Sequence, residues 1–103
     1  MTRENDRRTA LARVADEAEV LAEKLRFYES CVISAPSDRS YDYALYMTDP
    51  TANADEFDRR FDKYVAGMEA SLARITEAVE RFVAEHRAEL IELGIDYLPG
   101  GAP

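Results

Sequence analysis

The side chains with the clearest chemical potential are a histidine and a glutamate near the C-terminal end, His86 and Glu89. A spacing of three residues places both on one face of a helix, and di-iron helical bundles use a glutamate and a histidine at this separation. In this chain the histidine precedes the glutamate, which is the reverse of the di-iron order. The apolar stripe of the first predicted helix contains no carboxylate that could act as a further ligand. The pair therefore defines an alternative function, a metal-binding or catalytic helical bundle built on His86 and Glu89.

The rest of the chain offers no recognisable catalytic machinery. The sequence contains no Ser-His-Asp set, acid–base pair or glycine-rich phosphate loop. Its one cysteine, Cys31, permits no disulfide within the chain and no cysteine cluster for zinc. We therefore predict a protein that is not an enzyme and that uses no cofactor.

A second group of residues is suited to contact other proteins. Tyr41, Tyr43, Tyr46 and Met47 lie between two prolines in a segment rich in turn-forming residues. Tyrosine and methionine are enriched in protein interfaces, because they offer apolar area and, for tyrosine, a hydroxyl group. The segment could bind a partner, or it could fold over the end of the structure and close the core. The sequence leaves both possibilities open.

The elements that must position these side chains are two long amphipathic helices. From Leu11 to Val32, apolar residues recur at alternating spacings of three and four, which is a heptad pattern. No glycine or proline precedes Pro36, and a proline disfavours helix at the residue before it. We therefore predict a first helix over about residues 3–33, followed by a crossover over residues 34–53. Within the crossover, residues 40–47 could form two separate turns of helix.

The second helix has recognisable signals at both ends. Asn53 followed three residues later by Glu56 resembles a capping box, and an apolar series then continues to Leu93. Gly94 fits the left-handed position that commonly ends a helix, with an apolar residue after it. This pattern predicts a second helix over about residues 54–93.

Together these patterns predict an all-α chain. Two long antiparallel helices form a helical hairpin with a tyrosine-rich crossover. We expect one domain over residues 1–98 and a flexible tail over residues 99–103.

Two helices share only one interface, so a hairpin alone cannot bury two apolar stripes. A second copy of the chain would complete a four-helix bundle, and a different protein partner is the other solution. The second helix is longer than the first, so its last turns should run past the first helix. The residues that we expect to contact a partner lie in the crossover and in this overhang: Tyr41, Tyr43, Tyr46, Met47, Phe82, His86, Leu90 and Leu93.

Charge and composition restrict the possible partners. The 103 residues include 13 Lys and Arg against 21 Asp and Glu, for a net charge of −8. Nucleic-acid binding requires clustered cations, and an acidic membrane surface would repel this chain. Because no bilayer-length apolar run and no secretory signal pattern appear, we expect no membrane association and a cytoplasmic location. The predicted function is a non-enzymatic protein–protein interaction module for assembly, adaptor or regulatory roles.

Overall fold

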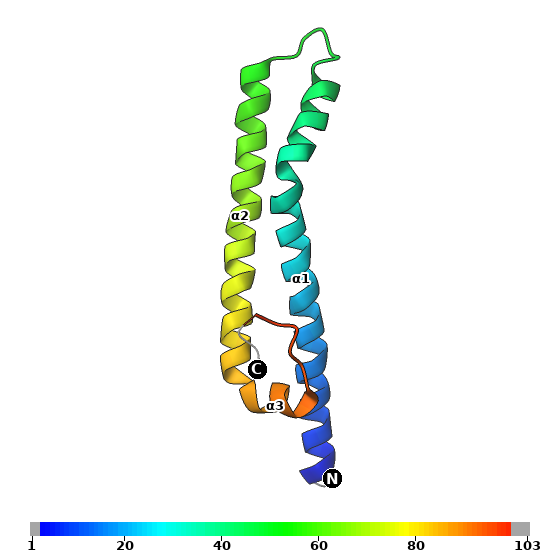
Figure 1. Ribbon diagram of the computed structural model, residues 1–103. Helices are drawn as coiled ribbons and strands as arrows, with labels where there is room; N and C mark the ends of the chain where they lie inside the picture. The colour runs from blue at the N-terminus through cyan, green and yellow to red at the C-terminus, as the bar shows by residue number, and fades with distance from the viewer. Residues whose placement is uncertain (1–2, 100–103) are drawn as a thin grey trace. The chain divides into compact units, whose positions relative to one another are not determined.

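The computed structural model describes residues 3–99, and all regular structure in this range is helical (Figure 1). The chain forms α1 (Arg3–Tyr46), α2 (Ala54–Glu85) and α3 (Arg87–Leu93). No strand occurs within the described range. The prediction of an all-α chain built on two long helices is therefore confirmed. The predicted flexible tail lies outside the described residues, apart from Pro99.

The chain divides into two compact units, and both long helices contribute to each. Unit 1 comprises residues 1–26 and 74–103, and unit 2 comprises residues 27–73. Within each unit the α1 segment and the α2 segment run in opposite directions (Figure 1). The prediction that residues 1–98 form one domain stays a prediction.

Unit 1 has a core to which three helices contribute. Its buried residues come from α1, where they are spaced by three or four, and from α2, α3 and the segment after α3. An ion pair between Arg7 of α1 and Glu92 of α3 connects the same elements at the surface. The hydrogen bond to Glu92, and then its negative charge, raise the pKa of Arg7. The buried residues of this core are Val14, Ala18, Ala22, Leu25, Val79, Phe82, Val83, Leu90 and Leu98.

The second long helix does not continue to Leu93, so this part of the prediction was wrong. The chain turns at His86, where φ is −119° and ψ is 26°, and α3 begins one residue later. The turn places Leu90 in the core with 1% of its surface exposed, and Leu98 follows with 3% exposed. The apolar area that becomes buried explains the turn. Neither the periodicity of the sequence nor a helix-breaking residue predicts it.

The predicted end of the second helical segment is confirmed. Gly94 adopts the left-handed conformation, with φ of 67°. Its N–H donates to the carbonyl of Ile91 at 3.1 Å, and the N–H of Ile95 donates to the carbonyl of Leu90 at 3.0 Å. These bonds satisfy carbonyl groups that the helix end would otherwise leave without partners.

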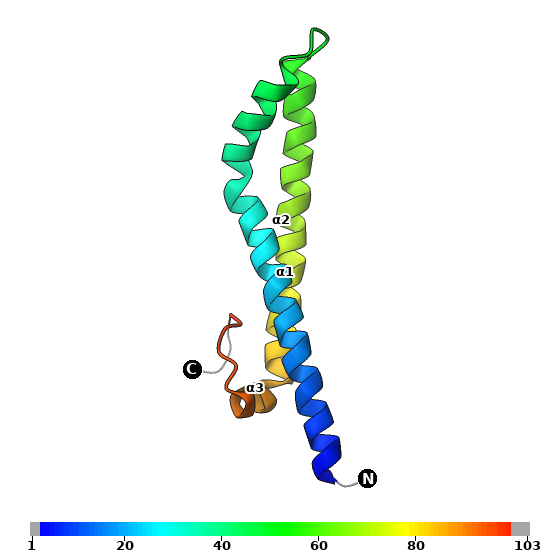
Figure 2. The same ribbon diagram turned by 90° about the vertical axis from the view of Figure 1, so that its right-hand side faces the viewer.

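In unit 2, α1 continues through Pro36 to Tyr46, and the predicted end near residue 33 was wrong. A proline inside a helix removes one backbone hydrogen bond and costs about 3 kcal/mol. The helix bends in this stretch, as expected at a proline (Figure 2). It nevertheless continues, because Ala35 is buried with Phe57 and Phe61 of α2, and Tyr46 packs against the same cluster.

The connection between the long helices is consequently short, over residues 47–53. The N–H and hydroxyl of Thr51 both donate to the carboxylate of Asp49 at 2.8 Å, and the backbone bond contributes most to lowering the pKa of Asp49. The side-chain oxygen of Asn53 accepts the N–H of Glu56 at 3.1 Å, which confirms the predicted helix cap. The tyrosines expected in a loop therefore lie on the last turns of a helix.

Candidate functional site

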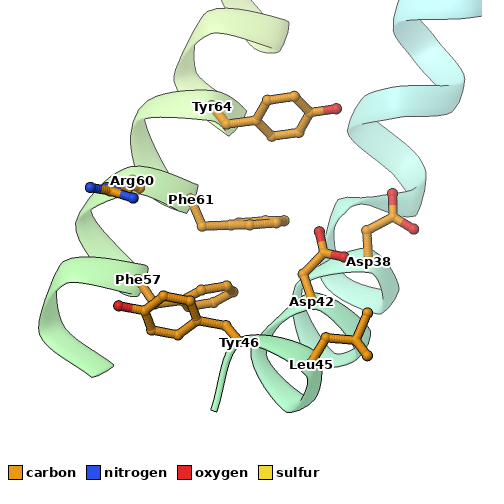
Figure 3. A pocket seen from close by; sticks show the side chains of 8 residues that line it. All are labelled: Asp38, Asp42, Leu45, Tyr46, Phe57, Arg60, Phe61 and Tyr64. Carbon is orange, nitrogen blue, oxygen red and sulfur yellow. The ribbon is translucent and has the colours of Figure 1, made fainter. Parts of the chain in front are cut away.

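Unit 2 carries an open groove of about 510 Å³ between its two helical segments (Figure 3). Aromatic side chains of α2 form one part of it, and the last turns of α1 form the other. The residues that line this groove are Asp38, Asp42, Leu45, Tyr46, Phe57, Arg60, Phe61 and Tyr64.

Stacked and tilted aromatic rings form the apolar part of the groove. Phe57 and Phe61 are one helical turn apart on α2, and their ring centroids are 5.7 Å apart in a stacked arrangement. Tyr64 continues this row, with its ring 5.7 Å from that of Phe61. Figure 3 shows all three rings projecting from α2 toward α1. Such pairs fix one another's orientation, and each adds about 0.5–1.5 kcal/mol beyond area burial.

The α1 side of the groove is acidic. Asp38 and Asp42 lie one turn apart, and the carboxylate of Asp38 accepts a hydrogen bond from the hydroxyl of Ser34 at 2.9 Å. Within residues 3–99, no cationic side chain forms an ion pair with either aspartate. Across the groove, Arg60 donates to Glu56 at 2.6 Å and points away from the aromatic rings (Figure 3). The groove therefore joins an aromatic surface to two uncompensated negative charges.

The structure divides the predicted tyrosine cluster into two kinds of residue. Tyr43 contacts Phe57 edge-on at 5.3 Å, and Tyr46 lies 5.5 Å from the same ring. The hydroxyl of Tyr46 also accepts the N–H of Asn53 at 3.1 Å, so Tyr46 secures the end of α1 against the connection. Tyr41, by contrast, is 68% exposed. The packing of Tyr43 and Tyr46 on Phe57 fits the possibility that the segment closes the core, whereas partner binding by the segment stays a prediction.

The exposed members of the predicted cluster are Tyr41, Tyr43 and Met47, with 68%, 39% and 41% of their surfaces exposed. Tyr41 lies one helical turn from Asp38 and one turn from Leu45, on the α1 side of the groove. Tyr41 does not line the groove itself, and from this spacing we expect it beside the groove's outer edge.

The predicted contact residues near the C-terminal end belong to unit 1, whereas the groove belongs to unit 2. Phe82 and Leu90 are buried, and the ring of His86 lies 4.8 Å from that of Phe82. His86 and Leu93 are half-buried. The expected overhang is therefore folded into the chain's own core. A partner role for these residues stays a prediction, and Phe82 and Leu90 would have to leave the core to serve it.

The metal-binding alternative finds no set of ligands to build on. His86 and Glu89 are half-buried on either side of the start of α3. In the part of the chain that the structure describes, no group of three or more His, Cys, Asp or Glu side chains could hold a metal ion. Structural and catalytic sites usually draw three or four ligands from the protein.

The groove was not predicted from the sequence, although one signal for it was present. Asp38 and Asp42, like Tyr41 and Leu45, are spaced by four residues, which is the helical repeat. Because Pro36 was taken to end the first helix, this spacing was not connected with that helix. Phe57 and Phe61 were assigned to an apolar stripe and are buried, but the residues of α1 that pack on them were expected in the crossover.

Comparison of the chain with protein-family models, with curated proteins and with solved structures finds no match. Among residues 3–99, no helix combines the length and the apolar character needed to cross a bilayer. The function must therefore be inferred from the geometry of the chain itself.

Proposed function

We propose that this chain is a non-enzymatic protein–protein interaction module whose working surface is the groove of unit 2. One observation carries the proposal: large apolar side chains remain exposed around an aromatic groove. Tyr41, Leu45 and Tyr64 have 68%, 54% and 46% of their surfaces exposed. Exposed apolar residues gathered around a preformed groove are typical of sites that bind a protein partner.

The small core of unit 2 supports this proposal. Ala35, Phe57 and Phe61 are its buried core residues, whereas seven of the ten exposed large hydrophobic residues of the described range lie in this unit. Covering one such leucine or phenylalanine fully contributes about 1.5–3 kcal/mol. Two helices share only one interface. A partner in the groove would therefore stabilise unit 2 by covering apolar side chains that this interface leaves exposed.

A homodimer that forms a four-helix bundle remains part of the proposal. Phe27 and Ile33 of α1 are 60% and 76% exposed and do not line the groove, so each leaves apolar area outside it that a second copy could cover. We expect the protein to act in the cytoplasm, where its single cysteine would stay reduced.

Site-specific photocrosslinking in the native cells tests this function. A benzophenone amino acid replaces Tyr64, and the matched control replaces Tyr97, a tyrosine of similar exposure in unit 1. We expect a specific crosslinked protein from position 64 and not from position 97. A second copy of the chain would give a product of twice 11.7 kDa, and a different partner would give another mass.

A second substitution makes the crosslinking test decisive. Leu45→Arg replaces an apolar contact by a bulky charged side chain in the groove and should abolish the product from position 64. The absence of any product from position 64, or a product that survives Leu45→Arg unchanged, would contradict the proposed function.

A further inference from the structure

The groove of unit 2 also indicates the chemistry of its partner. We propose that it binds a basic amphipathic segment of another protein, in which a lysine or arginine side chain lies beside Asp38, Asp42 and the ring of Tyr64. This inference rests on the proposed function and adds the character of the ligand. The chemistry follows from the charges, the rings and the size of the groove.

The balance of charge within the groove is negative. Asp38 and Asp42 both line it, and no cation within residues 3–99 pairs with them. Arg60, the only basic residue that lines the groove, is bound to Glu56. The net charge of −8 acts in the same direction at longer range. A partner of positive charge would therefore be attracted to this surface and oriented by it.

The aromatic rings suit the same ligand. A lysine or arginine is attracted to the face of an aromatic ring, and its aliphatic stem can pack on apolar surface while the charged group meets a carboxylate. Tyr64 and Leu45 supply apolar contact near the two aspartates. A volume of about 510 Å³ is that of a cleft that takes a small ligand or a few side chains. The groove is therefore suited to one face of a segment, with apolar and basic residues adjacent.

A second copy of this chain is a poor occupant of the groove. In a two-fold symmetric dimer the same patch meets itself, so Asp38 and Asp42 of one protomer would face those of the other. Like charges placed opposite one another oppose association. In a heterologous contact, Arg7 and Arg8 near the N-terminus would first have to leave their ion pairs with Glu92 and Glu4.

Titration calorimetry on the full-length chain at physiological salt provides the test. The probe is a synthetic amphipathic helix of leucine and lysine, about 18 residues long, which is enough to form helix on binding. Two matched peptides replace every lysine by glutamine or by glutamate. We expect the lysine peptide to bind at one copy per chain, the glutamine peptide to bind about tenfold more weakly, and the glutamate peptide not to bind.

Two pairs of substitutions locate the charge effect. Asp38→Asn with Asp42→Asn removes both carboxylates from the groove. This double variant should bind the lysine peptide about tenfold more weakly and should bind the glutamine peptide with unchanged affinity. The control, Glu19→Gln with Glu23→Gln, removes two exposed acids at the same spacing on α1, within unit 1. Because exposed charges are screened over about 8 Å at this salt concentration, the control should change binding by less than about twofold.

Several results would overturn the inference. Equal binding of the lysine and glutamine peptides, reduced alike by Tyr64→Ser, would show a groove that binds segments without regard to charge. In that case the proposed function would stand and the inference would fail. Equal weakening by the two acidic pairs would show that the groove does not hold the cation. The inference also fails if no peptide binds, and the crosslinking experiment still decides the proposed function separately.

Discussion

The two units of this chain use similar helical segments but differ in how completely they bury them. In unit 1, α3 and the segment after it add a third layer of contacts, and Val79, Leu90 and Leu98 are 1–3% exposed. In unit 2 the buried aromatic residues, Phe57 and Phe61, each retain 8% exposure. Unit 1 thus has a closed core, and unit 2 has an open groove beside a small one.

This difference shows what a third element contributes. Two helices share one interface, so apolar residues on their other faces stay in water unless something else covers them. In unit 1 the turn at His86 returns the chain over this surface, whereas unit 2 contains only two helical segments and a short connection. The surface left open in unit 2 is where we place partner binding.

The largest expected effect comes from truncating matched leucines in the two units. Leu90→Ala should lower the free energy of unfolding by about 2–5 kcal/mol, because it leaves a cavity in a closed core. Leu45→Ala should change it by less than about 0.5 kcal/mol, because Leu45 is already half in water. Urea unfolding followed by circular dichroism measures both. Equal losses would mean that the two units are equally closed, and the comparison would then be wrong.

The second effect concerns the bend in unit 2. Pro36→Ala restores an N–H to the middle of α1 and should raise the free energy of unfolding by about 1–3 kcal/mol. Hydrogen exchange should slow over residues 37–46. The control Ser37→Ala changes the neighbouring exposed position and should stay within about 0.5 kcal/mol. A loss of stability in Pro36→Ala would instead show that the bend is needed to seat Ala35 on the core.

Two glycines should respond with opposite signs. An added Cβ meets no atom within 4 Å at Gly67 or at Gly94, so crowding does not decide either case. Gly67→Ala, inside α2, should stabilise the chain by about 0.5–1 kcal/mol through helix propensity. Gly94→Ala should destabilise it by about 1–2 kcal/mol, because Gly94 has a φ of 67°. Thermal unfolding of both variants measures this contrast, and stabilisation by Gly94→Ala would contradict the assigned end of α3.

The smallest effect is the pH response of the connection in unit 2. Hydrogen bonds from Thr51 hold the pKa of Asp49 below its ordinary value. The stabilisation is therefore fully present above the ordinary aspartate pKa and is lost as the pH falls through the lowered value. NMR titration should show the Thr51 amide signal moving with the Asp49 carboxyl at that lowered midpoint. Asp49→Asn should abolish this movement, and a movement that persists would assign it to another group.

Local sequence signals led to correct predictions at positions where backbone chemistry alone acts. The cap at Asn53 and the left-handed Gly94 were both identified, because each depends on one side chain or on the lack of one. The two errors have a common cause. Pro36 was expected to end α1, and nothing at His86 indicated a turn, yet in both places the burial of distant apolar residues outweighed local preference.

The candidate site also combines features that local sequence signals predict with features that depend on distant packing. The composition of the tyrosine-rich segment predicts a contact surface, which stays a prediction. Its spacing allowed two turns of helix over residues 40–47, but the continuity of these turns with α1 was not predicted. Only packing of the last turns of α1 on Phe57 and Phe61 places Asp38, Asp42 and Leu45 beside an aromatic row. The predicted C-terminal overhang was wrong, because Phe82 and Leu90 are buried in the chain's own core.

By itself the sequence determined the helical class, the start of both long helices, the cap and end signals, and the negative charge. These follow from residue type and from spacing within a few turns. Tertiary structure alone decided which apolar residues are covered and which remain exposed, because burial depends on partners far apart in the chain. That decision produced one closed unit and one open unit, and the open one carries the proposed binding groove.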